Sequence, residues 1–499
     1  MQNQKVNGFR VLMMVVVVSL GVWSKVAAEP VNVEAIPSEV DLAEQMLTHW
    51  STEFSEVDLT TTVSISLRFS RALSAHFTEA NGVAEIHLDT GEVQVDVEGL
   101  EVPSTGHYEV WLVENVPGAP MGAALDLDVD VIINVGELFP TGSLQTTLAP
   151  ETLADFEIDL AAVMHIAPNQ EPEIVIVGMQ SIVLEMSRLA KSTAGPLETI
   201  NKLANEMKSG RDLFTKETFD GNGRTCATCH IPNRGFTITP DIIKRLPKND
   251  PLFVFKTNKD LAQLENEKLL KKRALFLENI RGFKERPFFR GSPSVENSAK
   301  SAPFGHSGNI GDLQTFSMGA IEQHFPRTLK REKNVDFRVP TQQELKAMEA
   351  FQLSVAFPRN KNFNFDSFVK TEQEKRGQEL FFGAGRCGAF CHVGPVLGNS
   401  RTFDTGVVDL PINKRDRLPL DTGDGGGGFD TPQLFGIART APYFHDNSVN
   451  TLKEAVTFYT TSTFANAPDG LDIQLDNQQI EDIVAFLKAI SQEGRRGRQ

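Results

Sequence analysis

Four cysteines and two histidines carry the strongest chemical signal in this 499-residue sequence. The segment Cys226-Ala-Thr-Cys229-His230 places two thiols two residues apart and an imidazole directly after them. This spacing is typical of c-type haem attachment, in which each thiol adds to a haem vinyl group and the histidine becomes an axial ligand of the iron. A zinc site, or a redox Cys-x-x-Cys pair with an incidental histidine, is the alternative.

A second cysteine pair departs from this spacing. Cys387 and Cys391 are separated by three residues, and His392 follows them. The additional residue must bulge out if both sulfurs are to reach vinyl groups, and a single thioether is the alternative. These four cysteines are the only ones in the sequence, and each pair ends in Cys-His. Covalent haem therefore accounts for them better than disulfides do.

The sequence around the two motifs is repeated. The first motif follows Gly-Arg-Asp-Leu-Phe at 210–214, and the second follows Gly-Gln-Glu-Leu-Phe at 377–381. Further on, residues 292–306 align without gaps on 431–445, and Leu313 then matches Leu452. Each copy ends in a predicted helix, at 341–356 and at 476–490. The repeat predicts two mainly α, cytochrome c-like haem domains at 200–355 and 360–495.

The N-terminus has the pattern of an export signal. Lys5 and Arg10 precede an apolar run at 11–23, and small residues lead up to Ala28. We expect a signal peptide at 1–28, a periplasmic or otherwise exported protein, and no membrane span after cleavage. A membrane anchor is the alternative, although the apolar run is short for one.

Charge separates the chain into two parts near residue 185. Residues 29–185 contain 28 acidic and two basic residues, whereas the chain from Met186 onward has a net charge of +7. The acidic region, 29–190, is predicted to be a separate domain. It could steer a basic electron-transfer protein to the molecule, or it could be an ordinary solvated face. No nucleic-acid partner is expected.

The acidic region reads as β-structure. Six apolar or alternating runs, separated by Gly-containing turns, predict an all-β sandwich-like domain, whereas 36–76 look more helical. Five histidines in this part lack metal-ligand spacing and are read as structural or exposed. The predicted strands are 83–88, 93–97, 108–113, 131–135, 156–164 and 174–177, and the histidines are His49, His76, His87, His107 and His165.

From about residue 200 to 495 the chain resembles the bacterial di-haem cytochrome c peroxidase and MauG family. The resemblance rests on the two Cys–His motifs, on Gly235-Phe236, and above all on the stretch from Thr431-Pro432 to Ala-Pro-Tyr-Phe-His445-Asp446. It implies two covalent haems c. It also implies reduction of hydrogen peroxide with electrons from an external donor, such as a small cytochrome c or a cupredoxin.

The resemblance places Tyr459 opposite His392 at the second haem. Peroxidases of the family have a methionine as the sixth ligand, MauG-like members have a tyrosine, and Tyr459 follows His445 by fourteen residues. No methionine follows Met348, so methionine ligation would need Met348 or an earlier residue to reach over. A phenolate favours Fe(III) and lowers the potential. Alternatively Tyr459 is a core residue, and His445 or nothing is the sixth ligand.

The first haem departs further from the family pattern. The tryptophan that relatives place between the haems falls on His306, and their glutamine and catalytic acid fall on Phe316 and near Pro326. Glu322 and His324 are close enough in sequence to move the peroxide proton instead. Alternatively His306, Met318 or His324 ligates and closes this iron, or Met318 is simply part of the core.

The family also binds calcium between its haem domains. Thr440 and Pro442 match two of the contributing positions, and Gly291 stands where relatives have asparagine. A main-chain oxygen would survive that change, whereas a side-chain ligand would not.

These observations leave three functions open. The first is an exported peroxidase-type haem oxidoreductase. The second is an electron-transfer cytochrome with both irons six-coordinate and no turnover, favoured by the missing tryptophan and acid. The third is MauG-like oxidation of a partner protein, with the acidic domain as its docking surface.

Overall fold

The computed structural model describes residues 62–178 and 196–492. It leaves gaps at 70–73, 77, 79, 115–126, 128–129, 140, 155, 157, 159, 280–286, 302–303, 309, 311–312, 356–366, 394–395 and 399–400. The expected signal peptide, His49 and the helix expected before residue 62 lie outside the described residues. Within the described ranges, no helix is both long and apolar enough to cross a membrane.

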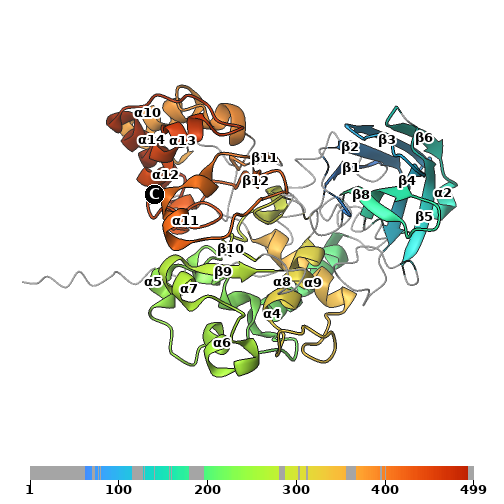
Figure 1. Ribbon diagram of the computed structural model, residues 1–499, viewed down its shortest axis with the longest axis horizontal. Coiled ribbons are helices and arrows are strands. Elements are labelled where there is room, and N and C mark those ends of the chain that lie inside the picture. The colour runs from blue at the N-terminus through green and yellow to red at the C-terminus, as the bar shows by residue number, and fades with distance from the viewer. Residues whose placement is uncertain are drawn as a thin grey trace, which may run out of the picture. The chain divides into compact units, whose positions relative to one another are not determined.

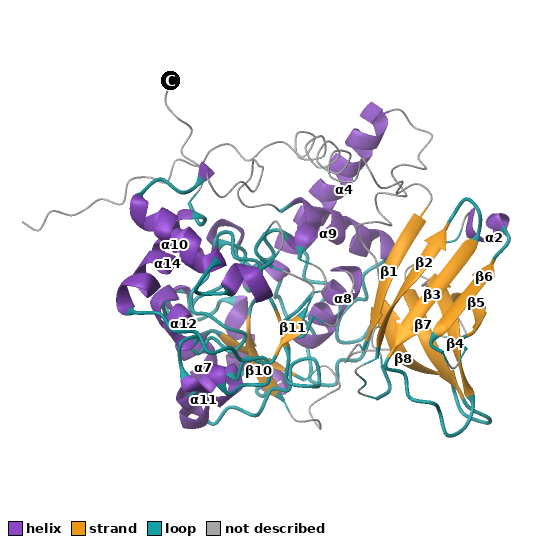
Figure 2. Cartoon of the chain, turned by 90° about the horizontal axis from the view of Figure 1, so that it is seen from above, coloured by secondary structure: helices purple, strands orange, loops and turns teal. Residues whose placement is uncertain are grey.

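The N-terminal part is one antiparallel sheet with strand order β5-β4-β7-β8-β1-β2-β3-β6. Figures 1 and 2 show these strands side by side. The bounds are β1 Thr62–Arg68, β2 Asn81–His87, β3 Glu92–Glu98, β4 His107–Glu114, β5 Val131–Glu137, β6 Ser143–Thr147, β7 Leu160–Ile166 and β8 Glu173–Gly178, with the short helix α2 at Pro150–Ala154.

Alternating side chains form the core of this sheet. In β3 the valines 93, 95 and 97 are buried and the residues between them are exposed, as expected for a strand with one face on a core. The edge strands β5 and β6 contribute Val135 and Leu144 to the same core, and they contact each other. The strands thus form one continuous sheet curled over its core, where sequence reasoning expected a sandwich.

All six predicted strands are present, but two others were missed. The helical expectation for 36–76 is wrong at β1, where Val63, Ile65 and Leu67 are buried and alternate with serines and threonine. The strand β6 has the single buried apolar residue Leu144, so its pattern is weak.

The chain from Pro196 onward is mainly helical, with short ladders between the helices. The helices are α4 Pro196–Lys216, α5 Pro240–Ile243, α6 Val254–Thr257, α7 Glu267–Arg273, α8 Leu313–His324, α9 Gln342–Ser354, α10 Glu372–Phe382, α11 Pro411–Asp416, α12 Leu452–Phe458, α13 Ser462–Ala465 and α14 Asn477–Ala489. The ladders pair β9 Leu275–Glu278 with β10 Phe288–Gly291, and β11 Thr402–Phe403 with β12 Phe429–Asp430.

Two helix pairs repeat one packing arrangement. Helix α4 packs on α9, and α10 packs on α14; Figures 1 and 2 both show the second pair side by side. Each crossing is centred on a glycine. A Cβ on Gly210 would lie 1.8 Å from the Ala347 carbonyl oxygen, and one on Gly377 would lie 1.8 Å from that of Asp482. Only glycine allows such a close approach.

The segments after the motifs repeat as well. A 3₁₀ turn at Ser298–Lys300 has its counterpart at Ile437–Arg439. The isolated bridge Phe304↔Ile310 has its counterpart in Tyr443↔Val449. These positions correspond in the gap-free alignment, so the internal repeat is one of structure as well as of sequence.

Replacing Gly377 by alanine should destabilise the second helix pair. We expect Gly377→Ala to lower the free energy of unfolding by about 2 kcal/mol, because the clash outweighs the gain in helix propensity of about 1 kcal/mol. The exposed Glu379 on the same helix is a control, and Glu379→Ala should change stability by less than about 0.5 kcal/mol. Equal denaturation midpoints for the two variants would contradict the close crossing.

Candidate functional site: two cysteine–histidine motifs

The first motif lies in a tight loop after α4. Cys226–Thr228 form a 3₁₀ turn, and the amide of His230 donates to the Cys226 carbonyl at 2.9 Å. The His230 Nδ1 donates to the Phe236 carbonyl at 3.0 Å. A neutral imidazole that carries its proton on Nδ1 has a free lone pair on Nε2, which is the state an iron ligand needs.

The second motif makes the same contacts with a wider turn. Cys387–Cys391 form one turn of π-helix, and the amide of His392 donates to the Cys387 carbonyl at 2.8 Å. The His392 Nδ1 donates to the Leu397 carbonyl at 2.8 Å. The predicted bulge is therefore present, and His392 is in the same protonation state as His230.

The four cysteines are free thiols in the structure. Burial raises the pKa of Cys226, Cys229 and Cys387 to about 12 and that of Cys391 to about 11. Burial also lowers the pKa of His230, and that of His392 to about 4, against the opposing effect of their carbonyl partners. Both sites therefore contain neutral thiols beside a neutral imidazole.

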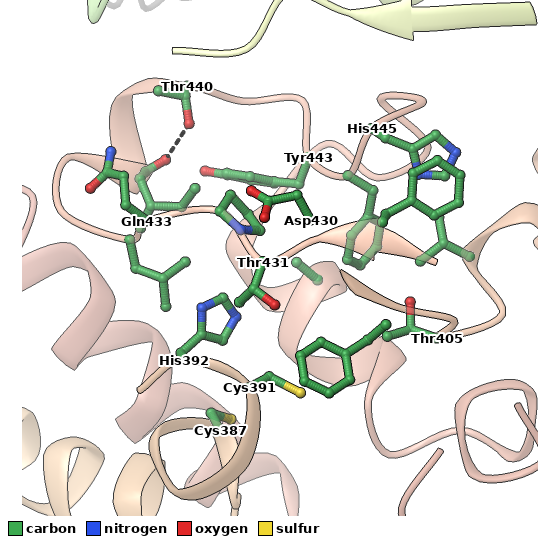
Figure 3. Close-up of a pocket in the computed structure, with 18 of the residues that line it drawn as sticks. Cys387, Cys391, His392, Thr405, Asp430, Thr431, Gln433, Thr440, Tyr443 and His445 are labelled. Carbon is green, nitrogen blue, oxygen red and sulfur yellow. Dashed lines mark hydrogen bonds between the residues drawn. The ribbon is translucent and has the colours of Figure 1, made fainter. Parts of the chain in front are cut away.

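The second motif opens into a cavity of about 340 Å³. Figure 3 shows Cys387, Cys391 and His392 on one side of it and Tyr443 on the other. Its wall is mostly apolar, from residues such as Leu434, Val456 and Ile483. A cavity of this size and character suits a planar organic cofactor.

Tyr459 also lines this cavity. Burial raises the pKa of the Tyr459 phenol above its usual value, and the charges of the nearby Cys387 and Cys391 also raise it. Rings of Phe444, Phe458 and Phe464 pack around it at centroid distances of 4.9–6.1 Å.

No methionine is among the described residues that line the cavity. Met348 is buried elsewhere, in a cluster with Phe219, Met318, Ile321 and Phe325. It therefore does not reach the second motif.

His306 and His445 lie together on this cavity rather than beside the first motif. His306 donates from Nε2 to the Gly291 carbonyl at 2.9 Å, and burial together with the charge of Arg290 lowers its pKa to about 3. The His445 ring is 6.4 Å from that of His306 and stacks on Phe429 at 3.6 Å. Both histidines are thus neutral groups where the two repeats meet.

The positions predicted for calcium also lie on this cavity. Thr440 and Pro442 line it, and Figure 3 shows the Thr440 hydroxyl turned to a neighbouring carbonyl, that of Ile437 at 3.0 Å. The Gly291 carbonyl already accepts from His306. In the described part of the chain, no three His, Cys, Asp or Glu side chains group as metal ligands; main-chain calcium ligation stays a prediction.

The first motif is surrounded by an apolar cluster on one side and a buried ion pair on the other. Cys226 packs against the cluster that contains Met318, which supports a core role for Met318. The charges of Arg224 and Glu265 both influence the pKa of Cys229. Arg224 donates from Nη1 to Glu265 at 2.9 Å, and both side chains are almost completely buried.

His324 lies next to this ion pair. Its Nδ1 is 3.9 Å from Glu265 Oε1 and is buried without a hydrogen-bond partner. Burial lowers the pKa of His324 well below its usual value, and the charges of Arg224, Arg331 and His230 contribute.

Sequence reasoning missed Glu265 and Arg224. Glu265 belongs to no motif, and only its burial and its contact with Arg224 identify it. The other predicted acid, Glu322, lies apart from this group, with its carboxylate 3.5 Å from Lys333 Nζ. Of the predicted residues Glu322, His324 and His306, the structure thus brings only His324 to the buried ion pair of the first motif.

The residues of both sites fit a covalently attached haem. Each site offers two thiols and a neutral imidazole, and the second offers a mainly apolar cavity. At the first site the Ser292 hydroxyl lies 3.4 Å from His230 Nε2. A zinc site would need three or four protein ligands, and among the described residues no three His, Cys, Asp or Glu side chains group as metal ligands.

Known proteins support the same conclusion, although no protein-family model matches the sequence. Cytochrome-c peroxidase IdrP1 of Denitromonas iodatirespirans is 26% identical over 336 residues, which are 58% of this chain and 82% of that protein. Cytochrome c551 peroxidase of Pseudomonas aeruginosa is 33% identical over 162 residues, 29% of this chain and 42% of that protein. A MauG-like protein associated with microbial copper homeostasis aligns in structure at 22% identity and a TM-score of 0.39, over 57% of this chain and 88% of that one.

The cysteine–histidine sites and these relatives define a peroxidase-type haem oxidoreductase. Within that class, the chain is similar to cytochrome-c peroxidases over about 58% of its length. The relatives imply covalently bound haem c.

The position of Tyr459 predicts a spectroscopic effect. If its phenol oxygen ligates the second iron, Tyr459→Phe should change the EPR signal of that ferric haem and leave the other signal unchanged. Tyr443→Phe is the matched control, because Tyr443 lines the same cavity without a phenol predicted to ligate. A Tyr459→Phe spectrum identical to that of the unmodified protein would exclude the ligand role.

Proposed function

We propose that the protein is an exported di-haem c-type peroxidase that reduces hydrogen peroxide with electrons from a small donor protein, a cytochrome c or a cupredoxin. The proposal assigns one haem to each repeat, at 200–355 and 360–495, and leaves 29–190 as a separate acidic domain. The observation that supports it most is the pair of equivalent motifs, each with a neutral histidine hydrogen-bonded through Nδ1.

Bound haem would supply the redox chemistry, and the chain's own residues would hold and tune it. His230 and His392 would be the axial ligands on one face of each iron. Tyr459 would be the second ligand of haem 2, with the apolar cavity excluding water. A buried phenol gives up its proton reluctantly unless a cation replaces that proton, and iron is such a cation.

His324 would move the peroxide proton at haem 1. Burial and the charges of Arg224, Arg331 and His230 keep its ring neutral, so one ring nitrogen has a lone pair for the proton, and Glu265 Oε1 lies 3.9 Å from Nδ1. Arg224 holds that carboxylate in place, and the Leu277 amide donates to its other oxygen at 3.0 Å. Glu265 and Arg224 would thus be positioning residues that act through His324.

A non-catalytic electron-transfer cytochrome is the second candidate, and the position of His324 also favours it. The same imidazole could ligate the first iron and close it. A peroxide-induced change in the high-spin absorption band of the ferric protein separates the two, because a six-coordinate haem has no open position for peroxide. MauG-like oxidation of a partner protein, with the acidic domain as its docking surface, is the third candidate.

The proposal is tested by peroxide-dependent oxidation of a reduced small cytochrome c, followed by the donor's absorbance. Peroxidase function predicts turnover that saturates with peroxide and requires the loaded enzyme. Its absence with several cytochrome and cupredoxin donors, together with a ferric spectrum that peroxide does not change, would support the electron-transfer alternative.

A pair of variants separates the two acid–base candidates. We expect His324→Gln to reduce peroxide turnover by about 10²–10⁴-fold, the usual contribution of a positioned acid–base group, without changing the spectrum of the second haem. Glu322→Gln should retain most activity, because the Glu322 carboxylate faces Lys333. The reverse order of effects would transfer the role to Glu322.

A further inference from the structure

The two cysteine–histidine motifs have the same length from the first cysteine to the residue whose carbonyl accepts from the histidine. We call this segment the frame of the motif. In the first site, the carbonyl that accepts from the histidine belongs to Phe236, ten residues after Cys226. In the second it belongs to Leu397, also ten residues after Cys387. The second motif has one more residue between its cysteines and one fewer residue between its histidine and the carbonyl acceptor. The frame therefore has the same length in both motifs, and only the second cysteine and the histidine stand one residue later within it.

The change from a 3₁₀ to a π turn absorbs that shift. The histidine amide donates to the carbonyl of the first cysteine at both sites, across four residues in one and five in the other. A π turn contains one more residue per hydrogen-bonded ring than an α turn. The histidine rings also end in matching places, with centroids 6.1 Å from Phe214 and 6.2 Å from Phe381, which are equivalent residues of the repeat.

Three residues in and next to the π turn have geometries that fit its additional residue. A Cβ on Gly388 would lie 2.3 Å from the Phe382 ring, so only glycine fits at this position. Arg386 begins the turn with a left-handed backbone, at φ 55°. Phe390, in the widened part, is turned toward solvent and the Phe403 ring. Both Cys387 and Cys391 consequently line the same cavity as His392.

We propose that haem at the second site is attached through two thioethers, to Cys387 and Cys391, in spite of the three-residue spacing. This inference rests on the proposed di-haem function and goes beyond it. In each attachment the S–H bond and the vinyl π bond break, a sulfur–carbon bond forms, and the proton goes to the other vinyl carbon. The addition is redox-neutral and requires no oxidant.

Alkylation of the intact, loaded protein with iodoacetamide under denaturing and reducing conditions tests the inference without an activity assay. Peptide mass spectrometry then counts the reactive thiols. Two thioethers at both sites predict no alkylated cysteine. A single alkylated cysteine at 387 or 391 would overturn the inference and leave the di-haem proposal intact, whereas alkylation of both would remove the second haem itself.

Deletion of Phe390 tests the constant frame. The deletion restores the usual two-residue spacing but shortens the frame by one residue, so we expect reduced haem loading and alkylation of Cys387 or Cys391. A matched variant with the same deletion and one alanine inserted directly after His392 restores the ten-residue frame and should load fully. A deletion variant that loads as completely as the unmodified protein would show that the frame does not determine attachment.

Discussion

The hydrogen bond from each histidine Nδ1 to a main-chain carbonyl is the interaction on which the two sites depend. It places the ring proton on Nδ1 and fixes the plane of the ring. The acceptors, Phe236 and Leu397, follow the histidines by six and five residues. Conservation of this bond through a change in cysteine spacing indicates that the histidine, more than the cysteines, sets the geometry of each site.

The helix crossings at Gly210 and Gly377 supply the rigid frame around those bonds. At each crossing a phenylalanine from the first helix packs on one from the second, at 5.3 Å for both Phe214–Phe351 and Phe381–Phe486. The same Phe214 and Phe381 contact the histidine rings. Close packing of the helices therefore positions the aromatic surface on which each imidazole rests, and a shift of the crossing would move the ligand.

The sequence alone was sufficient to predict features that depend on residues close together along the chain. The motifs, the internal repeat, the closing helices and six strands follow from spacing and periodicity. The strand β1 was missed because serine and threonine weaken its alternation, and Glu265 was missed because its role depends on Arg224 and His324, which are distant in sequence and meet only in the fold. His306 could be aligned, but its contact with the Gly291 carbonyl and its place beside His445 depend on how the two repeats pack.

The two sites differ mainly in their electrostatic surroundings. Beside Cys229 lies a buried ion pair with His324 next to it, whereas the wall of the second cavity is mostly apolar and includes the Tyr459 phenol and the neutral His306 and His445. A buried pair of opposite charges is costly unless its hydrogen bonds are satisfied, and both carboxylate oxygens of Glu265 are. Burial and the charges of Arg224 and Arg331 keep His324 neutral beside this pair. This contrast between the two surroundings is the reason for proposing proton transfer at the first site and relay of electrons at the second.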